Sequence, residues 1–130
     1  MFTLDQIKAA HTKVVSGADF PRYIQDLKTL GVKKYETFVS DGHTHFEGND
    51  SYALRTEPRY AAIKVNERSE ADNFKQYIKP HQSGGTSYQV FCQQCAEAGV
   101  EKWEVDLTRM TCTYFDTSGK QLLQEQIPLP

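Results

Sequence analysis

Four residues that can bind metal ions alternate along one short stretch, at Asp41, His43, His45 and Glu47. On a continuous strand, side chains two residues apart point to the same face. Imidazole nitrogens flanked by carboxylates suit Zn²⁺, Mn²⁺ or Fe²⁺. Since Asp41-Gly42 is also a hairpin signal, Asp41 would leave this row at a turn. The candidate metal ligands are therefore His43, His45 and Glu47.

A solvated strand face is the competing and favoured interpretation of this stretch. Thr44 and Phe46 would then point inward while the polar residues face water, as in an antiparallel sheet with one wet side. A His-x-His pair is by itself a weak metal motif. Metal binding is therefore kept as an alternative.

The stretch Cys92-Gln93-Gln94-Cys95 has the spacing of a redox or zinc motif. A reactive pair of this kind sits at a helix N-terminus, where the helix dipole lowers the thiol pKa. Here Cys92 begins the second turn of an expected helix and lies on its apolar stripe. Because a buried free cysteine behaves as a small hydrophobe, we predict that both thiols lie in the core, with zinc or redox chemistry as the alternative.

Two aromatic residues, Tyr35 and Trp103, begin the first strand of each half of the chain. The favoured interpretation is that they are core aromatics, which bury the junction between helices and sheet. The alternative makes them facing walls of a ligand-binding pocket between the halves. Such a pocket would prefer a flat or cationic ligand.

The stretch from His81 to Thr86 contains Ser83-Gly84-Gly85, whose backbone amides offer an anion site before a helix start. A flexible connection is favoured, because no Gly-x-x-x-x-Gly-Lys pattern is present. The sequence also lacks a Gly-x-Ser-x-Gly elbow. No catalytic residue and no cofactor are predicted.

Periodicity and capping signals predict two helices in the first half of the chain. The first begins at the capping box of Thr3 and Gln6 and continues to Gly17. The second follows a cap at Asp19 and ends at Gly31. Its apolar stripe makes it the best-defined helix of the sequence.

Two further helices are expected in the second half. The third opens at Ser69 and is stopped or kinked by Pro80, and the fourth is capped by Thr86 and closed by Gly99. Alternating patterns between turn signals predict strands at about 32–39, 43–47, 52–55, 60–65, 101–107, 110–116 and 120–127.

The two halves resemble each other when Gly31 is aligned with Gly99. Both then contain two helices and three strands, with the strand at 60–65 joining them, so an internal duplication is predicted. We expect a single α+β domain over residues 1–130, with repeats at 1–66 and 67–130. Because hairpins dominate the strand connections, the sheet should be mainly antiparallel with helices on one face.

Charge and composition argue against nucleic-acid binding and against insertion in a membrane. A net charge of −2 and a pI near 6.1 give no electrostatic reason to expect nucleic acid. No run approaches the ~20 apolar residues that cross a bilayer, and the N-terminus lacks a signal-peptide pattern, so a cytoplasmic location without membrane contact is expected. Under these conditions the three cysteines are expected to be reduced thiols.

Three stretches of the chain resemble the YbcV-like family, a group of small bacterial and prophage-borne proteins whose domain has no known function. They are residues 2–11 (FTLDQIKAAH), 31–37 (GVKKYET) and 98–103 (AGVEKW). The resemblance covers almost the whole chain and implies a soluble bacterial protein, with a prophage as one source. Some family members are labelled phage envelope protein, but nothing in this sequence supports an envelope role. The resemblance supplies no catalytic residues.

The leading functional hypothesis is a non-enzymatic binding or interaction module with an unknown partner. Its competitors are a metal-binding protein or metal-dependent enzyme using His43, His45 and Glu47, and a small-molecule binder with a pocket lined by Tyr35 and Trp103. Pairing of an exposed edge strand between two copies would provide a route to a homodimer.

Overall fold

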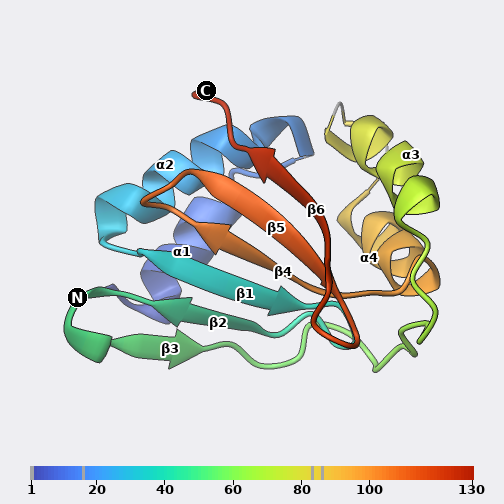
Figure 1. The fold of residues 1–130 in the computed structure, drawn as a ribbon. Coiled ribbons are helices and arrows are strands. Elements are labelled where there is room, and N and C mark those ends of the chain that lie inside the picture. The colour runs from blue at the N-terminus through green and yellow to red at the C-terminus, as the bar shows by residue number, and fades with distance from the viewer. Residues whose placement is uncertain (1, 16, 83, 86) are drawn as a thin grey trace.

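The computed structural model describes residues 2–15, 17–82, 84–85 and 87–130, which form an α+β fold (Figure 1). The first half contains α1 (Leu4–His11), η1 (Gly17–Asp19), α2 (Phe20–Leu30), β1 (Lys34–Phe38), β2 (Thr44–Glu47), η2 (Asn49–Ser51) and β3 (Ala53–Arg55). The second half contains α3 (Ala71–Gln82), α4 (Tyr88–Glu97), β4 (Val100–Asp106), β5 (Thr111–Asp116) and β6 (Gln121–Gln126).

The six strands form one sheet in the order β3-β2-β1-β4-β5-β6, and every pair in it is antiparallel. The first strands of the two halves therefore meet at the centre, where Thr37 lies opposite Trp103. The expected α+β class is confirmed. The order helix, helix and three strands occurs twice, while common descent of the two halves stays a prediction.

The helices cover one face of the sheet, as predicted. Tyr35 and Thr37 of β1 are buried beneath them, whereas Glu36 on the opposite face is only half-buried. On that outer face Lys102 Nζ lies 3.0 Å from Glu36 Oε1, and a second ion pair joins Lys34 and Glu104. Figure 1 shows α1 and α2 as one pair behind the sheet and α3 and α4 as a second pair beside it.

Local signals explain where several helices begin and end. The capping box of Thr3 and Gln6 opens α1, and Gly31 ends α2 with φ +100°, a left-handed conformation that favours glycine. Asp19 precedes α2 as expected, but without a capping bond, because its Oδ2 accepts from the Val15 N–H at 2.9 Å. The first helix ends at His11, earlier than predicted.

The start of α4 and the end of α3 also differ from expectation. The Ser87 hydroxyl caps α4 by accepting from the Val90 N–H, and the predicted cap Thr86 lies outside the described residues. Pro80 does not stop α3, which continues to Gln82. Pro80 lacks an N–H and cannot donate to the Gln76 carbonyl one turn earlier, and the helix ends two residues after it.

The predicted strand at 60–65 is wrong. This segment instead crosses the turn after β1, where the Tyr60 hydroxyl donates to Val39 O at 2.5 Å and the Ile63 N–H donates to Ser40 O at 2.7 Å. Tyr60, Ile63 and Val65 pack against the core without strict alternation, so no strand ladder forms.

The core lies between the sheet and the helices. Its fully buried side chains include Phe74, Ile24, Leu27, Leu107, Val39, Val100, Val105, Cys92 and Cys95. No helix in the described part of the chain is long and apolar enough to cross a membrane.

Candidate functional site

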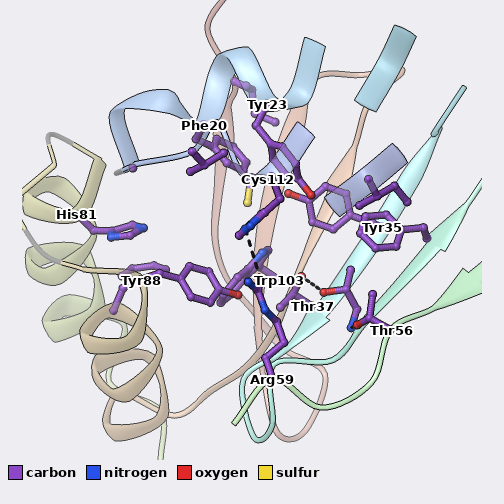
Figure 2. Close-up of a pocket in the computed structure, with 18 of the residues that line it drawn as sticks. Phe20, Tyr23, Tyr35, Thr37, Thr56, Arg59, His81, Tyr88, Trp103 and Cys112 are labelled. Atoms are coloured by element: carbon purple, nitrogen blue, oxygen red, sulfur yellow. Dashed lines mark hydrogen bonds between the residues drawn. The ribbon is translucent and has the colours of Figure 1, made fainter. Parts of the chain in front are cut away.

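A cavity of about 720 Å³ lies between the two helix pairs, and the helix-covered face of the sheet forms its floor (Figure 2). Residues from α1, α2, the central strands, the segment 56–59 and the α3–α4 pair line it. Ligand sites typically have volumes of roughly 300 to 1,000 Å³ and mostly apolar walls. This cavity therefore has the size and position of a small-molecule site.

Both aromatic residues singled out in the sequence, Tyr35 and Trp103, line this cavity. They belong to separate aromatic groups: the Tyr35 ring lies 5.4 Å from Phe46, whereas the indole contacts three other rings. These are Tyr88, Phe91 and Tyr114, at 6.2, 5.8 and 6.2 Å. Because Tyr35 and Trp103 are only 4% and 6% exposed, they are core aromatics that also form the cavity wall.

An irregularity in β4 turns Trp103 toward the cavity. The register between β4 and β5 shifts between Val100 and Lys102, so Glu101 is an extra residue on β4. A bulge of this kind lets residues three apart share a face. Val100 and Trp103 are accordingly both buried on the helix side.

Arg59 brings a positive charge to the cavity wall. Its guanidinium carbon lies 5.3 Å from the centre of the Tyr88 ring, and its Nη1 donates to His11 Nε2 over 3.4 Å. No ion pair formed among the described residues includes Arg59. Sequence reasoning assigned neither Arg59 nor His11 a functional role, because only the packing of distant segments brings them together.

The environment of Arg59 keeps its neighbours uncharged at neutral pH. Burial, reinforced by the guanidinium, lowers the pKa of His11 below its ordinary value. Burial raises the pKa of Tyr23 to about 12, although the Arg59 charge opposes this shift. Burial also raises the pKa of Tyr88 well above its usual range. The tyrosine hydroxyls therefore remain protonated and able to donate hydrogen bonds.

An acidic group lies in another part of the wall. Glu125 of β6 accepts a hydrogen bond from Gln82 Nε2 at 2.8 Å, which joins α3 to the edge of the sheet. Close by in the chain, the His81 ring stacks on Phe91 at 4.0 Å. The predicted loop position of His81 is wrong, because the residue belongs to α3, and Ser83 of the proposed anion loop lies outside the described residues.

Three threonines add hydroxyl groups to the cavity. Thr37 and Thr44 are cross-strand neighbours whose Oγ1 atoms lie 3.0 Å apart. Thr56 Oγ1 accepts from the Thr44 N–H at 2.8 Å. This chain of hydrogen bonds ties the segment after β3 to the floor of the cavity.

The histidine row lies apart from the cavity. Asp41 lies in the turn between β1 and β2 and not on the strand. Its Oδ1 accepts from the His43 N–H at 3.0 Å and contacts His43 Nδ1 at 2.5 Å. These hydrogen bonds outweigh burial and lower the pKa of Asp41. His43 also stacks on Phe38 at 4.5 Å. His45 and Glu47 point away from the cavity, since Thr44 and Phe46 line it.

No group of three His, Cys, Asp or Glu side chains that could hold a metal ion occurs in the described part of the chain. His45 lies opposite Glu36 and Arg55, and Glu47 lies opposite Ala53. Metal binding by this row stays a prediction.

The cysteine prediction is confirmed. Cys92 and Cys95 are free thiols that are 1% and 0% exposed on the inner face of α4. Burial raises the pKa of both thiols, which keeps them protonated. Cys112, which sequence reasoning left without a role, is 4% exposed in the cavity wall, and burial raises its pKa to about 12.

Fold and site together define a small α+β protein with a cavity between two helix pairs over an antiparallel sheet. A family model described as a protein of unknown function, DUF1398, matches residues 8–126, so the chain belongs to that family. No curated protein matches the chain. The YbcV-like label and a prophage origin stay predictions.

Proposed function

We propose that this protein binds a small molecule with an aromatic or other apolar body in the cavity between the helix pairs. The observation that carries the proposal is a space of about 720 Å³ with mostly apolar walls, to which eight Phe, Tyr and Trp residues contribute. Among the hypotheses left open by the sequence, this geometry favours the small-molecule binder with a pocket between the halves. Among the described residues, no comparable feature supports the interaction-module or metal hypotheses.

The chemistry of the wall favours binding over catalysis. The thiol of Cys112 has a pKa of about 12, so little of the nucleophilic thiolate forms at neutral pH. His11 is neutral and its Nε2 already accepts from Arg59, which occupies the nitrogen that would act as a base. An apolar ligand, in contrast, gains from displacing poorly bound water in such a space.

Binding of the neutral dye Nile red tests the proposal. We expect the dye to become fluorescent with the native protein at one site and to raise its melting temperature. Cys112→Phe extends a ring into the cavity and should abolish dye binding. Gln121→Phe, which adds the same ring at an exposed position of β6, serves as the matched control.

Retained cooperative unfolding will verify that the cavity variant is folded. If Cys112→Phe does not fold, Val14→Phe blocks the same cavity from the segment after α1. Unchanged dye binding in a folded cavity variant, or no binding to the native protein, would overturn the proposal.

A further inference from the structure

We infer that the ligand is an organic monoanion, an aromatic or branched aliphatic carboxylate whose charge meets Arg59 while its apolar body lies against the aromatic wall. This inference rests on the proposed function, because it identifies the class of molecule that the same cavity takes. Four observations support it, beginning with the position of Arg59.

The backbone holds Arg59 at the cavity. Its N–H donates to Asp41 O at 2.8 Å, so the turn after β1 anchors the segment that follows β3. Gly42 makes this approach possible, because a Cβ there would meet Tyr60 Cε2 at 2.7 Å and Arg59 Cβ at 3.2 Å. Figure 2 shows the Arg59 side chain rising between Tyr88 and Thr37. The guanidinium is thus directed inward although the residue as a whole is exposed.

The charge of Arg59 is not neutralised by the described residues. Its side chain contacts the neutral His11 imidazole and the face of the Tyr88 ring, and no ion pair includes it. A guanidinium carries five N–H donors in a planar fork that matches the two oxygens of a carboxylate. The long contact to His11 uses one of them, so a bidentate partner can still be accepted.

Two tyrosines lie near Arg59, and the guanidinium carbon is 5.3 Å from the ring centre of one of them, Tyr88. The Tyr23 and Tyr88 hydroxyls stay protonated at neutral pH, as described above, and Tyr23 packs edge-on against His11 with ring centres 5.4 Å apart. A carboxylate beside Arg59 would therefore meet neutral tyrosines, and none of the described acids that line the cavity is fully buried. This arrangement favours an anion over the cationic ligand that the aromatic pair alone suggested.

The other charged groups of the lining leave this preference in place. Lys8 and Glu57 are exposed, and Glu125 is hydrogen-bonded by Gln82. One inward guanidinium matches one negative charge, whereas a phosphate dianion usually needs several cations or backbone amides. A monoanionic carboxylate fits the site best.

Three probes with one ring system and different charges test the inference: 2-naphthoate, 2-naphthamide and 2-naphthylmethylamine. Isothermal titration calorimetry with the full chain should give at least about tenfold tighter binding for the carboxylate than for the amide, since hydrogen bonds to charged groups are the stronger ones. The amine should bind most weakly. Higher salt should weaken carboxylate binding selectively.

Arg59→Gln should reduce carboxylate binding to the level of the amide, and Arg59→Lys should restore part of the difference. Arg55→Gln is the matched control, because it removes the same charge from β3 and leaves the cavity lining intact. Nile red binding reports in parallel whether each variant retains the cavity.

The outcomes separate the two proposals. Equal binding of carboxylate and amide, tightest binding of the amine, or full carboxylate affinity in Arg59→Gln would overturn the inference while leaving the cavity a binding site. Nile red binding without binding of any naphthyl probe would also overturn it. Failure of Nile red and all three probes would overturn the proposed function itself.

Discussion

The hydroxyls of Thr37 and Thr44 form a buried pair whose energetic coupling can be measured. The residues lie opposite each other on β1 and β2, are 3% and 7% exposed, and have Oγ1 atoms 3.0 Å apart. Replacing one threonine by valine keeps the shape but leaves the other hydroxyl without this partner. An unsatisfied buried hydroxyl costs about 1 to 3 kcal/mol, whereas removing both groups together can be nearly neutral.

We expect Thr37→Val and Thr44→Val each to lower the free energy of unfolding by about 1 to 2 kcal/mol. The double variant should lose less than the sum, with a coupling of about 1 kcal/mol. Urea unfolding followed by fluorescence of Trp103, the only tryptophan in the sequence, and by circular dichroism gives these values. Thr108→Val, at an exposed position, is the control and should change stability by less than about 0.5 kcal/mol.

Additive losses in the double variant would refute this reasoning. If the single losses are small as well, water in the cavity satisfies the remaining hydroxyl, and the pair is solvated although both residues are buried. The cycle therefore also reports how wet the floor of the cavity is.

Three further predictions concern other parts of the molecule. Cys92→Ala should lower stability by about 1 to 2 kcal/mol through lost burial, and rapid labelling of the native thiol would contradict its core position. The His11 pKa is lowered by folding, so this residue should cost stability as pH falls below about 6.5, where only the unfolded imidazole gains a proton. Urea unfolding at pH 7.5 and 5.5 should show a smaller decline for His11→Gln, and an equal decline would contradict this. The metal hypothesis predicts stoichiometric Zn²⁺ that is lost in His43→Ala/His45→Ala; equal metal content in both proteins would contradict it.

The sequence predicted the features that depend on short-range signals. The apolar stripe and terminal glycine located α2, and the alternation around Tyr35 and Phe46 located β1 and β2. Comparison of the halves paired Tyr35 with Trp103. For this reason these two residues of the cavity wall could be named from the sequence. These signals lie within a few residues of each other or repeat along the chain.

The sequence could not predict features set by contacts between distant segments. The residues at 60–65 are of types that favour strands. In the structure, however, Tyr60 and Ile63 form hydrogen bonds with the turn after β1, outside the sheet. The same docking directs Arg59 toward His11, which lies 48 positions away in the chain. Neither arrangement leaves a periodic trace in the sequence.

The pairing of β1 with β4 has a mechanical consequence. It is the one strand pairing in the described sheet that joins the first three strands to the last three. A two-residue slip in its register would move Trp103 along β1 by roughly 7 Å, so this single ladder fixes the spacing of the two aromatic groups. A ligand bound between these groups would contact both halves of the sheet. The free energy needed to separate β1 from β4 would therefore rise with the ligand concentration.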